Sequence, residues 1–148
     1  MNFTGKYEAK LNAKNQVTLP SSMREVLFFS EKSVQLVLFC QKASTYLDIF
    51  PMQIWNEKQK QVHAIAQEKK DRNLSRKFNE LAHAFVLEED GNGRLLIPQR
   101  FIQFLQPNSE LTFIGNFEKI ELWNSSALQS EETETVLSQG EKDLIFGF

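Results

Sequence analysis

The amino-acid sequence predicts a mixed α/β protein with a β-rich core, made of two pseudo-symmetric β-hairpin modules with flanking helices. Three observations predict this fold class. The first two are an internal repeat of weak identity but matching order, and a polar turn between strand-like segments in each copy. A third is the helical texture between the copies, where residues 52–84 contain neither Gly nor Pro. Strand patterns interrupted by helical patterns are typical of folds that mix the two element types.

The repeat relates positions that are 78 residues apart, as residue 16 is to residue 94. Residues 16–20 (QVTLP) match residues 94–98 (RLLIP) at this separation, and Met23 matches Phe101. Later in each copy, at a separation shortened by five residues, residues 46–50 (YLDIF) resemble residues 119–123 (KIELW). Self-similarity at a fixed separation indicates duplicated units. We therefore expect both copies to contain a strand, a turn, a strand, a proline, a short helix and two further strands.

Polar turns separate the first two strands of each copy. Residues 12–15 (NAKN) follow the alternating segment 6–11, and asparagine tolerates left-handed backbone angles. Residues 90–93 (DGNG) contain both a D-G and an N-G pair, which are the strongest short-range hairpin signals. The residues expected to form these turns are Asn12, Asn15, Asp90, Gly91 and Gly93.

Helices are expected after the prolines of the repeat and between the copies. Proline is tolerated in a first helical turn because its missing N–H has no partner there, which places short helices after Pro20 and Pro98. A polar break at residues 71–73 predicts two helices between the copies, and His83 is expected near the end of the second. One more helix is expected over residues 125–138.

These patterns divide the chain into four segments. Residues 1–51 form a first module, 52–81 a helical connector, 82–128 a second module, and 129–148 an acidic C-terminal helix or tail.

The net charge of −2 hides an uneven distribution of charge along the chain. Residues 1–100 carry 15 Lys/Arg and 11 Asp/Glu, whereas residues 101–148 carry 2 Lys/Arg and 8 Asp/Glu. Such asymmetry indicates either a basic binding face with an acidic flank or a chance spread of solvated charges.

Composition indicates a soluble protein of the cytoplasm. The chain has 148 residues, of which 41% are apolar and 24% charged, an ordinary globular mixture. The single cysteine, Cys40, excludes an intrachain disulfide and fits a reducing compartment. We find no signal-peptide pattern, and no run approaches the roughly 18 apolar residues that a membrane span needs.

The order of hairpin, proline and short helix, present twice, resembles the MraZ family. Residues 90–98 (DGNGRLLIP) keep the family's D-x-x-x-R motif, the opening residues 3–7 (FTGKY) look like the family's start, and the resemblance covers most of residues 3–128. It implies two swapped-hairpin modules related to AbrB-class DNA-binding domains. It also implies a homo-oligomeric ring that associates with the nucleoid and binds direct repeats in promoters of the division and cell-wall gene cluster.

The first copy departs from the family motif, since Asn12, Asn15 and Gln16 stand where aspartate, glycine and arginine are expected. DNA binding needs cations for phosphates and polar groups for base edges. Lysines that recur along the first hairpin, together with the repeat's arginines and one amide, meet this need. The candidate DNA-binding residues are Lys6, Lys10, Lys14, Gln16, Arg24, Arg94 and Arg100.

Four alternatives stand beside this interpretation. The lysines of the first hairpin could instead keep an exposed strand soluble and unpaired, and Arg94 could pair with Asp90 across its own turn instead of contacting DNA. The altered first turn and the apolar end of the chain (LIFGF) also suggest a relative that has lost specific DNA binding and acts through protein contacts. A small antitoxin-like dimer is a further possibility.

The sequence offers no catalytic constellation. His63, His83 and Cys40 are the only histidines and the only thiol, and no C-x-x-C, H-E-x-x-H or G-x-S-x-G motif is present. Trp55, Trp123 and the 13 phenylalanines are expected in the core or in a subunit interface. We therefore expect no enzyme, and neither a metal, a cofactor nor a small-molecule substrate.

Overall fold

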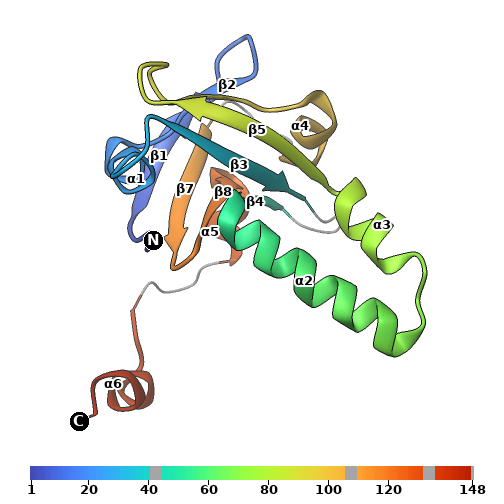
Figure 1. The fold of residues 1–148 in the computed structure, drawn as a ribbon. Helices are drawn as coiled ribbons and strands as arrows, with labels where there is room; N and C mark the ends of the chain where they lie inside the picture. The colour runs from blue at the N-terminus through green and yellow to red at the C-terminus, as the bar shows by residue number, and fades with distance from the viewer. Residues whose placement is uncertain (41–44, 106–109, 132–135, 148) are drawn as a thin grey trace.

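A six-stranded antiparallel sheet forms the centre of the computed structural model, which describes residues 1–40, 45–105, 110–131 and 136–147 (Figure 1). The sheet order is β1-β7-β8-β4-β3-β5, and a separate two-stranded ribbon pairs β2 with β6. The strands are β1 (Lys6–Lys10), β2 (Gln16–Thr18), β3 (Ser33–Phe39), β4 (Tyr46–Pro51), β5 (Ala82–Glu88), β6 (Arg94–Leu96), β7 (Glu110–Asn116) and β8 (Lys119–Asn124). The helices are α1 (Ser21–Leu27), α2 (Met52–Lys69), α3 (Leu74–Glu80), α4 (Gln99–Leu105), α5 (Ser125–Glu131) and α6 (Gln139–Phe146).

The sequence repeat is visible as a pseudo-two-fold axis through the molecule. Each edge strand of the sheet comes from the opposite copy, because β1 pairs with β7 and β5 pairs with β3. Repeat-equivalent residues face each other at two places: Val17 opposite Leu95 in the ribbon, and Asp48 opposite Glu121 in the sheet. The predicted α/β fold with two strand-exchanging modules is thus confirmed.

One face of the sheet carries the main core. Alternate side chains of the central strands, such as Leu38, Ile49 and Leu122, are buried there against the ribbon residues Val17 and Leu95. The helices α1 and α4 close this core with repeat-equivalent residues, which are Met23 and Leu27 from α1 and Phe101 and Leu105 from α4. Burial of this apolar surface fastens the short ribbon to the sheet, since three-residue strands have little stability alone.

The connector helices cover part of the other face. Trp55 of α2 stacks on Phe78 of α3 with ring centroids 4.4 Å apart, and both rings lie near Phe39 of β3. The predicted break between the helices is confirmed. Helix α2 ends at Lys69, its C-cap residue Lys70 has a left-handed φ of 54°, and Asp71 N–H donates to Ala66 O. The histidine His63 lies on an exposed position of α2.

The end of the second connector helix was predicted wrongly. The helix does not extend to His83, because α3 stops at Glu80 and β5 begins at Ala82. His83 is a strand residue opposite Leu38. All seven residues of β5 pair with β3, and this non-local ladder outweighs the local helix preference of the segment.

The predicted helix over residues 125–138 is only partly present. As expected, α5 starts at Ser125, but its described part ends at Glu131, and Glu132 lies outside the described residues. A separate helix, α6, begins at Gln139 after a capping box, in which Ser138 Oγ accepts from Glu141 N–H and Glu141 accepts from Ser138 N–H. Figure 1 shows α6 apart from the sheet, and Leu144, Ile145 and Phe146 are 89%, 62% and 59% exposed.

The N-terminal segment closes over β7 at Gly115. Phe3 is buried and exchanges two backbone hydrogen bonds with Phe117, while Gly115 N–H donates to Gly5 O over 2.9 Å. A Cβ atom on Gly115 would lie 2.6 Å from the backbone carbon of Phe3, a distance that requires one of the two segments to move. Close approach of two backbones is one of the conditions that demand glycine.

Gly115→Ala is therefore expected to lower the free energy of unfolding by about 1–3 kcal/mol, the typical cost of overpacking. Urea denaturation of the variant and the parent protein measures this difference. Gly140→Ala is the matched control, because a Cβ there meets only Ser138 Oγ at 4.0 Å and the residue lies in α6. Equal unfolding midpoints for Gly115→Ala and the parent protein would contradict the close packing of the N-terminal segment.

Candidate nucleic-acid interface

The outer face of the β2·β6 ribbon is polar although its inner face is core. Val17 and Leu95 point inward and are fully buried. The side chains that alternate with them point outward, and we call them the ribbon face: Gln16, Thr18, Arg94 and Leu96. The register places Gln16 opposite Leu96 and Thr18 opposite Arg94. Sequence reasoning missed Thr18 and Leu96; the signal was the alternation of QVT and RLL, which becomes informative only once the two segments are known to pair.

Two dyad-related hydrogen bonds extend the ribbon at its ends. Leu19 N–H donates to Gly93 O over 2.8 Å, and Ile97 N–H donates to Asn15 O over 2.9 Å. Asn15 and Gly93 are themselves equivalent in the repeat, and both have left-handed φ angles, of 60° and 67°. Asparagine is one of the few non-glycine residues that adopt this conformation readily, which is why the first turn forms without the family's glycine.

Asn12 organises the first turn. Its Oδ1 accepts hydrogen bonds from the backbone N–H groups of Lys14 and Gln16, each over 2.9 Å. Its Nδ2 donates to Gln16 Oε1 over 3.0 Å. The two residues that replace the family's aspartate and arginine thus keep a side-chain contact across the turn, as a neutral amide pair.

Each turn lies against a helix of the other copy. Asn15 Nδ2 in the first turn donates to Gln99 Oε1 of α4 over 3.2 Å. In the second turn, a Cβ on Gly93 would lie 2.8 Å from Arg24 Nε of α1, so glycine there also makes room for the arginine. Arg24 Nε is buried without a hydrogen-bond partner among the described residues. Arg24 is therefore held against the turn from which Arg94 projects.

Three acidic residues, Glu88, Glu89 and Asp90, lead into the second turn. Gly91 N–H donates to Glu88 O over 3.1 Å, and Asn92 has a φ of 61°. The suggested ion pair between Asp90 and Arg94 is not among the ion pairs of the described residues, and both side chains are exposed. Arg94 is consequently available to an external anion or base.

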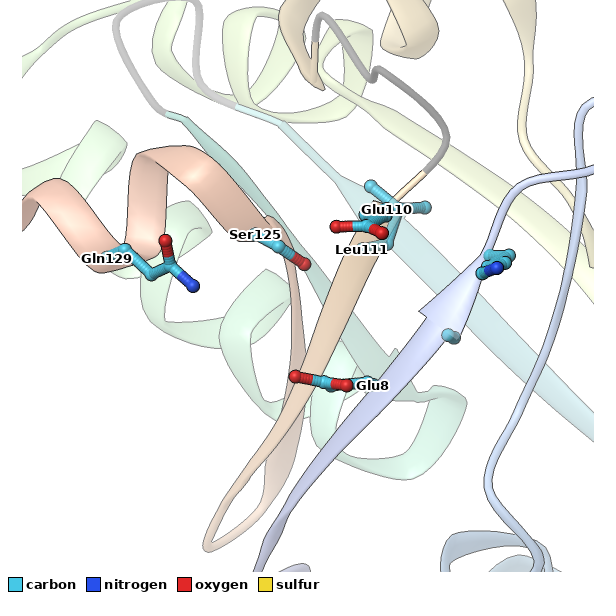
Figure 2. A pocket seen from close by; sticks show the side chains of 7 residues that line it. Glu8, Glu110, Leu111, Ser125 and Gln129 are labelled. Atoms are coloured by element: carbon cyan, nitrogen blue, oxygen red, sulfur yellow. The ribbon is translucent and has the colours of Figure 1, made fainter.

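The remaining candidate cations lie away from the ribbon face. Tyr7 and Ala9 of β1 pack toward the ribbon, so Lys6 and Lys10 point to the opposite side of the sheet. Lys10 lines a cavity of about 170 Å³, and Figure 2 shows Glu8 and Glu110 beside this cavity. Gln16 and Arg94 thus share the ribbon face, with Lys14 in the first turn and Arg24 beside the second. Lys6 and Lys10 lie on the other side of the sheet.

Arg100 has an internal role. Its guanidinium donates to Glu80 O over 2.7 Å and to Ala82 O over 2.6 Å, and it lies 4.6 Å from the ring centroid of Phe101. These two carbonyls flank the junction at which α3 ends and β5 begins. The contacts favour a role for Arg100 in positioning the connector over a role in DNA contact.

A second polar cluster lies on the face of the sheet opposite the ribbon. Lys119 Nζ is 2.7 Å from Asp48 Oδ1 and 3.3 Å from Glu121 Oε2. Burial raises the pKa of Asp48, although the Lys119 hydrogen bond acts against it. Burial also acts to raise the pKa of Glu121, but hydrogen bonds from Asn116 and Trp123 and the charge of Lys119 outweigh it and lower that pKa.

The described residues include no group of three or more His, Cys, Asp and Glu side chains that could hold a metal ion. Cys40 is buried, and desolvation followed by the charge of Asp48 raises its pKa to about 11. A thiol with this pKa is protonated at neutral pH and is a poor nucleophile. Among the described helices, none is long and apolar enough to cross a membrane.

Comparison with known proteins identifies the family. Residues 81–143 match the family model described as MraZ protein, antitoxin-like. The transcriptional regulator MraZ of Phocaeicola vulgatus is 33% identical over 129 residues, which are 84% of this chain and 80% of the relative. Transcriptional regulator MraZ of Shewanella halifaxensis is 30% identical over 142 residues, which are 96% of this chain and 92% of the relative. The resemblance carried by the turn motifs is confirmed, and the chain belongs to the MraZ family.

Proposed function

We propose that this protein is a sequence-specific DNA-binding transcriptional regulator that contacts DNA through the ribbon face and the two turns. The observation that carries the proposal is the ribbon itself, whose inner face is locked in the core while Arg94 and Gln16 project outward. Two relatives that match most of the chain are named transcriptional regulators. A regulator of this kind needs no catalytic group.

The proposed roles of the ribbon-face and turn side chains follow from their chemistry. A two-stranded antiparallel ribbon is one of the elements that the major groove of B-DNA admits. Arg94 and Gln16 lie at repeat-equivalent positions of the ribbon and can form hydrogen bonds with base edges. Lys14 at the exposed first turn and Arg24 beside the second turn are placed to neutralise phosphates.

Few cations per chain imply that several copies act together. In the proposal, residues 1–51 and 82–128 are the AbrB-like modules, residues 52–81 connect them, and residues 129–148 form an acidic tail. The copies form a homo-oligomeric ring whose subunits engage direct repeats in promoters of the division and cell-wall gene cluster. Avidity across repeated sites multiplies the affinity of one weak contact without any new interaction. Such a protein acts in the cytoplasm, at the nucleoid.

A binding titration tests the proposal. Purified protein is titrated with its own upstream region and with an unrelated duplex of equal length, each at low and at moderate salt. Tighter and salt-sensitive binding to the upstream region is expected, because released counterions make affinity fall with salt. Equal binding to both duplexes at each salt concentration would contradict a sequence-specific regulator.

Lys14→Ala is expected to weaken DNA binding about 2- to 10-fold for each subunit engaged and to reduce the steepness of its salt dependence by one phosphate contact. The matched control is Lys10→Ala, which removes the same charge from the opposite side of the sheet. Fluorescence anisotropy at several salt concentrations measures both quantities. A larger loss of DNA affinity for Lys10→Ala than for Lys14→Ala would indicate that DNA contacts the outer face of β1 and not the ribbon.

The second candidate function is that of a MraZ-family protein without specific DNA binding that acts through protein contacts. Two observations favour it: the amide at Gln16 where the family has arginine, and the exposed apolar end of α6. This candidate predicts equal affinity for all duplexes in the titration above. It also predicts that Leu144→Asp changes the oligomeric mass measured by light scattering and leaves any residual DNA binding unchanged.

A further inference from the structure

We propose that the two ends of the ribbon face read different base pairs, so that the end formed by Gln16 and Leu96 prefers A·T and the end formed by Arg94 and Thr18 prefers G·C. The inference rests on the proposed function, and it specifies the DNA sequence that the same site would select. The backbone of the ribbon is pseudo-two-fold symmetric, whereas its four outward side chains are not.

The first end presents an oriented amide. Asn12 Nδ2 donates to Gln16 Oε1 over 3.0 Å, which turns the oxygen of Gln16 toward Asn12. A carbonyl oxygen has a second lone pair, and Nε2 carries two hydrogens that no described residue accepts. Adenine offers the N6 donor and the N7 acceptor that fit these groups in the major groove. Asn12 is thus a positioning residue for the contact that Gln16 makes.

An exposed leucine completes the first end. Leu96 lies directly opposite Gln16 in the ribbon and is 62% exposed, although the other three side chains of the ribbon face are polar. Side chains opposite each other across an antiparallel pair share one face and lie close together. Thymine carries the C5-methyl group in the major groove, and apolar side chains contact it. An amide beside an apolar side chain therefore fits an A·T pair. The amide bonds to adenine, and the apolar side chain contacts the methyl group of thymine.

The second end has the opposite chemistry. Arg94 is exposed, and no ion pair among the described residues engages it. A guanidinium forms two parallel hydrogen bonds with O6 and N7 of guanine, the commonest specific contact to DNA. The neighbour opposite Arg94 is the exposed hydroxyl of Thr18, which donates to or accepts from either base.

The spacing of the two ends matches that of DNA. Gln16 and Thr18 are two residues apart on one strand, about 7 Å at 3.3–3.4 Å per residue. Two base-pair steps of 3.4 Å cover the same distance. Each protomer would therefore select an A·T pair and a G·C pair about two steps apart. Because the ends differ, the two orientations of the ribbon on DNA are not equivalent.

Selection from random-sequence duplexes tests the inference. The parent protein is expected to enrich duplexes with an A·T position and a G·C position about two steps apart. The double variant Gln16→Arg, Leu96→Thr gives both ends the same chemistry, so its enriched duplexes are expected to replace the A·T position by a second G·C position. Thermal midpoints of the variants, which change only outward side chains, verify that the fold is kept.

Deoxyuridine provides a test that is specific to Leu96. An enriched duplex in which deoxyuridine replaces thymine lacks only the methyl group, and the parent protein is expected to bind it about fourfold more weakly, the equivalent of one buried CH₂. Leu96→Ala is expected to bind both duplexes equally. Thr18→Ala serves as the control variant and should keep the fourfold preference for thymine.

The outcomes separate the inference from the function on which it rests. Enriched sequences without an A·T position, or a double variant that enriches the parent's sequences, would overturn the inference and leave the regulator intact. A deoxyuridine duplex bound as tightly as the thymine duplex would likewise overturn the role of Leu96. Failure of the parent protein to enrich any sequence would overturn the proposed function together with the inference.

Discussion

Arg94→Ala is expected to weaken binding to the upstream duplex about 5- to 150-fold, which corresponds to the 1–3 kcal/mol of one bidentate contact between arginine and guanine. The effect should fall on binding and not on folding. Arg94 is exposed on the ribbon face, and no ion pair among the described residues depends on it. Anisotropy titration measures the loss, and urea denaturation verifies that the free energy of unfolding is unchanged.

Arg72→Ala is the matched control for Arg94→Ala. It removes the same charge from an exposed position between α2 and α3, and Figure 1 shows this junction far from β2. Loss of general electrostatic attraction alone would weaken binding similarly in both variants, since unpaired surface charges act at a distance. A specific contact predicts a large loss for Arg94→Ala and a small one for Arg72→Ala. Similar losses in the two variants would remove Arg94 from the base-reading surface.

Lys119→Met is expected to lower the free energy of unfolding by about 1–3 kcal/mol at pH values near 8, less than for a fully buried pair because the cluster is partly solvated. Lys119 is the cation that lies between Asp48 and Glu121, which face each other across β4 and β8. Without it, two ionised carboxylates would stand side by side with no compensating charge. Urea denaturation measures the change.

The pH dependence of this variant follows from the directions of the two pKa shifts. Asp48 has a folded-state pKa above its usual 3.8, so its ionisation lowers stability as the pH rises through that pKa. Glu121 has a folded-state pKa below its usual 4.5, so it contributes stability above 4.5 that is lost as the pH falls through the folded pKa. Removing Lys119 raises both folded-state pKa values, and the variant should be less destabilised near pH 5 than near pH 8.

Lys58→Met is the control for this second prediction. Lys58 pairs with Glu118 over 3.1 Å, but the two side chains are 35% and 32% exposed. Exposed pairs contribute about 0–1 kcal/mol, so this variant should lose little stability, and by the same amount at both pH values. If Lys119→Met lowered the free energy of unfolding as little as Lys58→Met does, the cluster of Asp48, Lys119 and Glu121 would stabilise the fold no more than an exposed ion pair.

Much of this fold was determined by the sequence alone. The separation of 78 residues between QVTLP and RLLIP predicted both ribbon strands and the two helices after the prolines. The turns at Asn12 and Gly93 could be expected because turn formation depends on local chemistry, namely side-chain acceptors and left-handed backbone angles. The motif of the second turn also identified the family, because order and spacing are properties of the chain itself.

Only the tertiary structure decided which side chains share a surface. Lys10 and Lys14 are close in sequence, yet burial of Tyr7 and Ala9 sends Lys10 to the far side of the sheet. Arg100 is a candidate DNA contact in the sequence, but in the structure its guanidinium donates to the backbone carbonyls of Glu80 and Ala82. Likewise, Leu96 entered the candidate site only through its register with Gln16. These outcomes depend on pairing between residues far apart in the chain, and local patterns carry no information about which distant strand will be the partner.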